Sequence, residues 1–155
     1  MSLNVVTGIG PRVGSSFVMQ QCVKAKYLVN GDKFLGGLLP KEGNPGGYYD
    51  LLPKQVAKVE QGIAKVWPVS LVNLQVPVNK LIILHRKSLE DQLNSIEKQI
   101  EREPITLDVT PENLVTSAEL FLNSWLDSQT NLEYRYYFTE NLDSDIEEIV
   151  TFLGD

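Results

Sequence analysis

The sequence predicts an α/β protein: a doubly wound parallel sheet of about four to five strands with helices on both faces. Short apolar runs alternate with segments of helical periodicity, and the first run leads directly into a glycine-rich turn. The run Leu81–Leu84 is apolar at every position, which is typical of a parallel strand buried on both faces. The chain has 155 residues, so we expect one domain, 1–155, with a single core.

The individual elements follow from period and from residues that start or stop helices. Strands are predicted at Leu3–Thr7, Ile63–Val66, Leu81–Leu84 and Glu133–Phe138. Helices are predicted to begin near Ser15, Pro53, Ser88, Thr110 and Ser144. Ser144 with Glu147 has the spacing of a capping box.

Two segments carry further expectations. In the helix that follows Thr110, we expect the core-facing residues to be Leu114, Ala118, Phe121 and Trp125. Residues 28–50 hold six glycines and two prolines without a clear period, which predicts a long irregular loop.

Composition excludes several classes of protein. No apolar run approaches the roughly 20 residues of a membrane span, and the N-terminus lacks a signal-peptide pattern. Cys22 is the lone cysteine, so an internal disulfide is excluded, and with one histidine a structural zinc site is not expected. We therefore expect a cytoplasmic protein without a membrane partner.

Charge is divided unevenly along the chain. Residues 1–102 carry 13 of the 14 basic and 8 of the 20 acidic residues, a net charge of +5. Residues 103–155 carry one Arg and 12 acids, a net charge of −11, which also suits a solvated acidic helix face. An anionic ligand is expected on the first part, and no nucleic-acid partner is expected.

The segment Gly8–Ser16 carries the strongest functional indication. Ligands of doubly wound sheets bind beyond the carboxyl ends of the strands, and this segment follows the first strand. Glycines allow the turn to aim several N–H groups at one anion, and the helix that follows adds the positive end of its dipole. The residues expected to hold the anion are Gly10, Arg12, Val13, Gly14, Ser15 and Ser16.

The segment is not a standard nucleoside triphosphate loop. Ser15 stands where that loop has Lys, and Ile9 stands where it has its first Gly. Arg12 would supply the fixed positive charge, from an exposed side chain. The alternative is a glycine-rich strand–helix turn that binds nothing.

Four stretches together resemble the sulfotransferase family. Residues 6–17 are similar to its phosphosulfate loop, and residues 44–50 to its Asn-Pro-x-Gly-Tyr-acid segment. Residues 81–86 with Asn94 and Ser95 resemble its 3′-phosphate element, and residues 138–142 with 152–154 resemble its closing segments. The resemblance covers nearly the whole chain and implies a P-loop hydrolase-like sheet. It also implies 3′-phosphoadenosine 5′-phosphosulfate as the cofactor.

The resemblance assigns further roles. Arg86, with Asn94 or Ser95, would hold the 3′-phosphate; without the family, Arg86 is as well explained by an ion pair with Glu90 or Asp91. Lys65, near the end of a predicted apolar strand, is not expected to be fully buried without a partner. The resemblance implies that it faces the transferred sulfonate.

The general base is not given by the pattern. Trp67 stands where the family's cytosolic branch has a catalytic histidine. The remaining candidates are Asp50, Glu42 and His85, and His85 is better explained as a packed strand-end residue. Asp50 is favoured because it lies in the loop beside Tyr48 and Tyr49, where it could meet an acceptor; the alternative is that it caps the helix that follows.

The function that the resemblance implies is transfer of a sulfonyl group to a hydroxyl or amine on a small molecule or glycan, without a metal. The catalytic residues would be Arg12, Lys65 and Asp50. Two alternatives remain: a kinase-like enzyme on a related fold, and a non-catalytic relative that binds a nucleotide or a protein. The chain lacks the late Arg-Lys-Gly loop of larger sulfotransferases, which favours the second alternative.

Overall fold

Within the residues that the structure describes, the protein is built around a sheet of four parallel strands in the order β2-β1-β3-β4. The structure, a computed structural model, describes residues 2–31, 49–102 and 110–154. The strands are β1 (Leu3–Gly8), β2 (Gly62–Lys65), β3 (Val78–His85) and β4 (Glu133–Phe138). The predicted α/β class with a parallel sheet is confirmed, and β4 matches its expected bounds.

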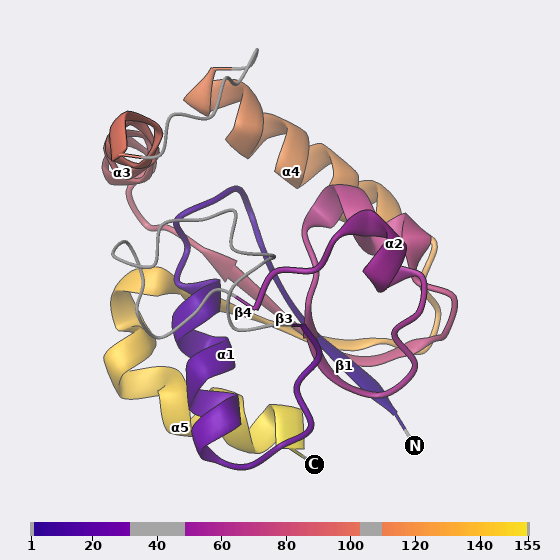
Figure 1. Cartoon of the computed structure of the whole chain (residues 1–155). Coiled ribbons are helices and arrows are strands. Elements are labelled where there is room, and N and C mark those ends of the chain that lie inside the picture. Colours follow the sequence, from indigo (N-terminus) through magenta and orange to yellow (C-terminus); the bar gives the residue numbers. More distant parts are fainter. Residues whose placement is uncertain (1, 32–48, 103–109, 155) are drawn as a thin grey trace.

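Helices cover both faces of the sheet (Figure 1). One face packs against α1 (Ser15–Lys24) and α5 (Leu142–Gly154). The other packs against α2 (Pro53–Val56), the 3-10 helix η2 (Pro68–Asn73) and α4 (Pro111–Asp127). The doubly covered sheet therefore separates two hydrophobic clusters.

Strand alternation explains the uninterrupted apolar runs. Successive side chains of a strand point to opposite faces. Val6 and Ile82 accordingly lie in the cluster under α1 and α5, whereas Val5 and Leu81 lie in the cluster under α4 and η2. All four are fully buried, so each face of β1 and β3 has to be apolar.

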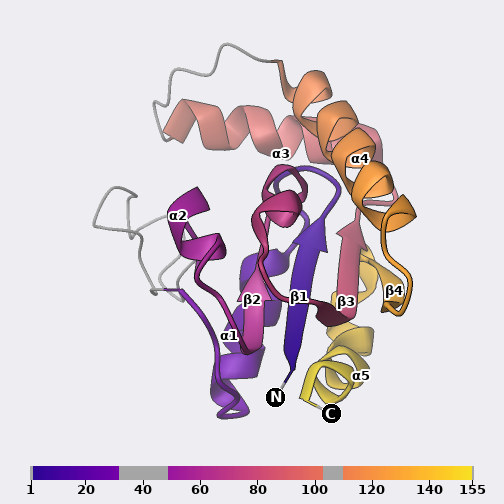
Figure 2. The ribbon, with the colours of Figure 1, turned by 90° about the vertical axis from the view of Figure 1, so that its right-hand side faces the viewer.

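Helix α3 (Leu89–Arg102) lies across the carboxyl ends of the strands (Figure 2). The arrows of β1 and β3 point toward it in this view. The Ser88 hydroxyl accepts a hydrogen bond from the Asp91 amide at 3.1 Å and so caps the helix start, as its sequence predicts. This position brings α3 next to the loop that follows β1.

The predicted start of α4 is confirmed and that of α5 is wrong. Thr110 is the N-cap of α4, with its hydroxyl accepting from the Asn113 amide at 3.2 Å. The 3-10 turn η3 (Thr139–Asn141) leads directly into α5, which begins at Leu142. Ser144 is therefore inside the helix, and its hydroxyl donates to the Asn141 carbonyl at 3.0 Å.

The buried face of α4 also differs from the prediction. Trp125 is buried as predicted, but the other buried residues are Val115 and Leu122, whereas the predicted Phe121 is 46% exposed. The helix packs against η2 with the stripe that contains Leu122 and Trp125. Residues 114, 118 and 121 form a second apolar stripe, and sequence periodicity alone does not show which of the two faces the core.

Most of the predicted loop 28–50 lies outside the described residues. Near its start, Val29 forms a single parallel bridge with Ile63 of β2. The helix predicted from Pro53 forms, and it ends at Val56 rather than near Gly62.

Candidate anion-binding site

The loop between β1 and α1 adopts a backbone that few residues tolerate. Gly10, Arg12 and Gly14 have φ angles of 85°, 65° and 89°. A Cβ atom on Gly8 would lie 2.3 Å from Cγ2 of Val13, so the loop folds back closely over the end of its own strand. Two of the three left-handed positions are glycines as expected, and the third is the arginine.

The start of α1 leaves backbone donors for a ligand. The first bond into the helix runs from the Val18 amide to the Gly14 carbonyl at 3.2 Å, so the amides of Ser15, Ser16 and Phe17 have no intrahelical acceptor. Gly14, the N-cap, has no side chain to cap them, and the first turn has no acidic residue. The positive end of the helix dipole is therefore not offset locally.

Two side chains from other elements hold the loop in place. The buried Gln92 of α3 donates from Nε2 to the carbonyls of Ile9 and Pro11, both at 2.9 Å. The Thr139 hydroxyl of η3 bonds the Val13 carbonyl at 2.6 Å and lies 3.2 Å from the His85 carbonyl. The amides of Ile9 and Gly10 are used as well, since they donate to the carbonyls of Leu84 and Gly8. The amides of residues 12–14 make no backbone hydrogen bond within the described residues, so they are the loop donors that a ligand could use.

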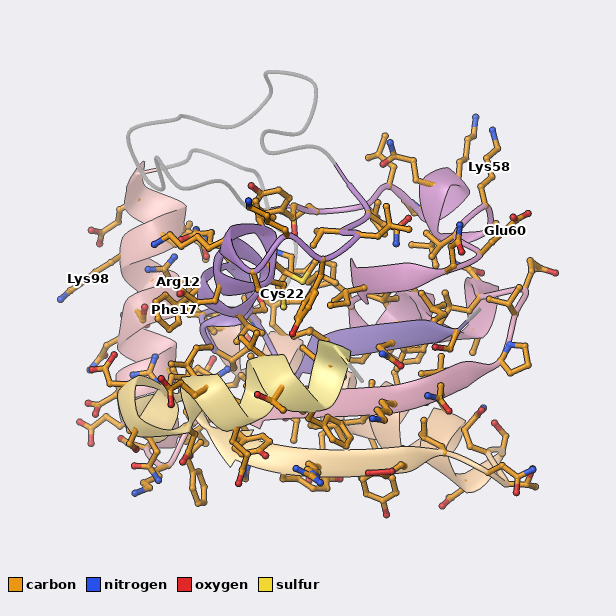
Figure 3. All side chains as sticks on the ribbon, turned by 90° about the horizontal axis from the view of Figure 1, so that it is seen from below. Arg12, Phe17, Cys22, Lys58, Glu60 and Lys98 are labelled. Atoms are coloured by element: carbon orange, nitrogen blue, oxygen red, sulfur yellow. The ribbon has the colours of Figure 1, made fainter. Side chains whose placement is uncertain are left out.

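Arg12 points from the loop toward α3, and Figure 3 shows it between α1 and α3. Its Nε donates to the Ser95 hydroxyl at 3.0 Å, and its own carbonyl accepts from Nη1 of Arg86 at 2.9 Å. The expectation that Arg12 is exposed is wrong, because these contacts leave it half-buried. Ser95, rather than the exposed Asn94, is therefore the residue of α3 that joins the loop.

Arg86 follows β3 and pairs with a carboxylate that sequence reasoning did not select. Its Nε donates to Glu140 at 3.1 Å, and the other oxygen of Glu140 accepts from the Lys87 amide at 2.9 Å. Burial opposes ionisation, but the Lys87 amide and the Arg86 guanidinium hold the pKa of Glu140 below its usual range. The predicted alternative partners, Glu90 and Asp91, do not form an ion pair with Arg86 in the described chain.

Lys65 ends β2 beside the start of α1. It is 3% exposed, and its Nζ lies 2.7 Å from Oδ1 of Asp50 and 3.2 Å from the Ser16 hydroxyl. Burial lowers the pKa of Lys65, and the carboxylate of Asp50 acts against that shift. The prediction that this lysine needs a partner when buried is confirmed, and the partner is one of the three candidate bases.

His85, the second candidate base, packs elsewhere. Its ring stacks on Phe138 at a centroid distance of 4.3 Å and meets Tyr136 edge-on at 5.5 Å. Burial lowers the pKa of His85, with Glu140 acting weakly against it. The packed role expected for this histidine is confirmed. The third candidate, Glu42, lies outside the described residues, as do residues 44–48.

The cluster as a whole comes from segments far apart in the sequence. The loop after β1, the end of β2 and the start of the chain after β3 contribute Arg12, Lys65 and Arg86. Sequence reasoning missed Gln92, Thr139 and Glu140; a buried polar residue on the inner face of an amphipathic helix was the available signal for Gln92.

Comparison of the chain with protein-family models, with curated proteins and with solved structures gives no match. Within residues 2–31, 49–102 and 110–154, no helix is long and apolar enough to cross a membrane. The same residues contain no group of three or more His, Cys, Asp or Glu side chains arranged to hold a metal ion.

Proposed function

We propose that the chain binds 3′-phosphoadenosine 5′-phosphosulfate at the loop after β1 and transfers its sulfonyl group to a hydroxyl or amine. One observation carries the proposal. Arg12, Lys65 and Arg86, from three separate segments, meet around the glycine loop and the start of α1 through Ser95, Ser16 and the Arg12 carbonyl. Lys65 is paired with Asp50 and Arg86 with Glu140, whereas Arg12 has no carboxylate partner among the described residues. The Arg12 charge beside the helix N-terminus favours an anionic ligand.

The backbone of Arg12 supports the same assignment. A left-handed conformation costs a residue with a side chain about 1–2 kcal/mol, and glycine would avoid that cost. Strain of this kind concentrates at functional sites, where the side chain is needed for binding. Arg12 would grip the 5′-phosphosulfate together with the amides of Ser15 and Ser16.

Transfer would be an in-line displacement at sulfur. The acceptor oxygen or nitrogen forms a bond to sulfur while the bond from sulfur to the phosphate oxygen breaks, which releases 3′,5′-bisphosphoadenosine. Lys65 and the Ser16 hydroxyl would stabilise the charge on the sulfonate oxygens, and Asp50 would take the acceptor's proton. Because Asp50 already pairs with Lys65, the base and the sulfonate-binding cation would act side by side.

A thermal melting experiment tests the cofactor directly. At a hundredfold excess over its dissociation constant, a ligand stabilises the native state by about 2.7 kcal/mol, or about 5–10 °C for a chain of this size. We expect that shift with 3′,5′-bisphosphoadenosine, a smaller shift with 5′-AMP, and no added effect of magnesium.

The same experiment separates the rivals. A shift only with ATP and magnesium would replace the proposal with a kinase-like enzyme. A shift with 3′,5′-bisphosphoadenosine but no transfer of labelled sulfonate to any hydroxyl or amine would leave a non-catalytic nucleotide-binding protein.

A further inference from the structure

A cavity of about 610 Å³ lies between η2, α3, α4 and the tip of the glycine loop. Its walls include Trp67, Pro68, Ile96, Ile100, Leu114 and Phe121. Among the described residues, those that line it are all uncharged. The volume falls within the range of small-molecule sites, roughly 300–1,000 Å³. An anion-binding loop therefore borders an apolar cavity of ligand size.

Helix α4 has apolar side chains on its cavity side as well as on the side that packs into the core. Val115, Leu122 and Trp125 form the stripe that packs inward. Three of the four residues predicted from sequence to face the core line the cavity instead, namely Leu114, Ala118 and Phe121. Exposed apolar side chains cost free energy unless something covers them, and Phe121 is 46% exposed. The helix thus has one apolar stripe for the core and a second one for the cavity.

The depth of the cavity favours a small molecule over a surface partner. Ile96 and Pro68 line it and yet are almost fully buried, with Ile96 only 1% exposed. Phe121 in contrast is 46% exposed, so the wall of the cavity runs from buried residues to an exposed rim. Polar groups are few: Asn113 and Ser117 stand among the lining residues, enough to orient a hydroxyl or amine but not to hold a charge.

The cavity also adjoins the candidate anion site. Gly10 and Pro11, at the loop tip, form part of its wall. The Trp67 ring, another part of the wall, lies 5.5 Å from Nζ of Lys65, which contacts Ser16 and Asp50. A molecule in the cavity would therefore lie one side chain away from the buried ion pair.

We propose that this cavity binds an uncharged, mainly apolar small molecule, of the size of one or two fused rings, that carries a single hydroxyl or amine. Binding to the cavity is independent of the proposed function. The further identification of this molecule as the sulfonyl acceptor rests on the proposed function.

The neutral fluorescent probe N-phenyl-1-naphthylamine tests the cavity in the absence of any nucleotide. We expect saturable binding to the full chain. Ala118→Phe, which fills the cavity, should weaken binding more than tenfold, and Phe121→Ala should weaken it about tenfold, as the loss of an aromatic contact does. Leu120→Ala is the matched control, because Leu120 is on the same helix, 67% exposed and not part of the lining.

Phe121 is half-exposed, so its replacement leaves the fold intact even if Ala118→Phe fails to fold, which circular dichroism will show. Equal probe affinity in wild type and Phe121→Ala would overturn the cavity assignment, and so would the absence of saturable binding. A wild-type dimer that Phe121→Ala converts to a monomer, measured by light scattering, would overturn it as well, because a second copy would then cover the stripe.

Arg12→Gly separates this inference from the proposed function. We expect the variant to bind 3′,5′-bisphosphoadenosine more than tenfold more weakly and to bind the probe with unchanged affinity. Probe binding by a wild-type chain that binds no 3′,5′-bisphosphoadenosine would support the cavity and contradict the cofactor. For the acceptor, naphthol should be sulfonated and a neutral disaccharide should not; the reverse preference would overturn the acceptor assignment.

Discussion

Arg12 and Ser95 are 83 positions apart in the sequence, and the Arg12 Nε donates a 3.0 Å hydrogen bond to the Ser95 hydroxyl. The bond joins the glycine loop to α3 and holds the Arg12 side chain against that helix. Arg86 completes the arrangement by donating to the Arg12 carbonyl at 2.9 Å. Arg86 is already paired with Glu140, whereas Arg12 has no carboxylate partner among the described residues, so Arg12 is the cation of this edge whose charge an anion would neutralise.

Arg12→Gly distinguishes a binding role from a structural one. Relief of backbone strain offsets the lost Ser95 bond, so we expect the free energy of unfolding to change by less than about 1 kcal/mol. Affinity for 3′,5′-bisphosphoadenosine should fall by about 1.5–3 kcal/mol, measured by titration calorimetry. Lys98→Ala is the control, since Lys98 projects from α3 into solvent (Figure 3) and should change neither quantity. Unaltered affinity in Arg12→Gly would remove Arg12 from the site.

Lys65 and Asp50 form a buried pair that is expected to be strongly coupled. Lys65→Met leaves the carboxylate without its cation, which should lower the free energy of unfolding by about 3 kcal/mol in urea denaturation. Lys65→Met combined with Asp50→Asn should be less destabilised than the Lys65→Met single variant. Additive effects of the two substitutions would show that the pair contributes no coupling energy.

Glu140 competes with any anion for Arg86. Glu140→Gln removes that competition, so affinity for inorganic phosphate should rise several-fold in calorimetry. The pKa of Glu140 is lowered in the folded chain, so its contribution to stability is present above the unfolded pKa and lost as pH falls through the folded one. The variant should therefore be less stable than wild type near neutral pH. Its free energy of unfolding should also fall less steeply than that of wild type as the pH is lowered. Asp143→Asn, also at the start of this helical segment, is the control.

His85 is the only histidine, so its titration is resolved in a proton NMR spectrum without assignment. We expect a pKa below the ordinary value, because stacking on Phe138 shields the ring from water. A depressed folded pKa means that stability falls as pH drops through the unfolded pKa toward the folded one. His85→Phe should remove that dependence in thermal melts between about pH 5 and 7. A pKa above the ordinary value would contradict the packed role.

Local patterns in the sequence predicted the elements better than the way they pack. Thr110 and Ser88 cap their helices as expected, because a cap depends on neighbours three residues away. Ser144 does not, since the chain enters α5 through a 3-10 turn in which Thr139 bonds the distant carbonyls of Val13 and His85. A contact over more than 120 residues leaves no periodic trace.

The candidate site shows the same division. The glycine loop was evident from residue types, and so was the need of Lys65 for a partner. The sequence did not show that Ser95, rather than Asn94, contacts the loop. That choice depends on the rotation of α3 about its axis, which the Ser88 cap and the buried Gln92 determine together. The Leu114–Ala118–Phe121 stripe was visible, but only the packed structure shows that it faces a cavity.

The Gln92 side chain has a consequence for how this site is transferred or altered by design. Its amide nitrogen donates to two carbonyls of the loop. The conformation of the loop therefore depends partly on a helix that lies more than eighty residues further along the chain. A graft of residues 8–16 onto another sheet would carry the amides and the arginine but not the template that positions them. The smallest transferable unit is the loop together with the first turns of α3.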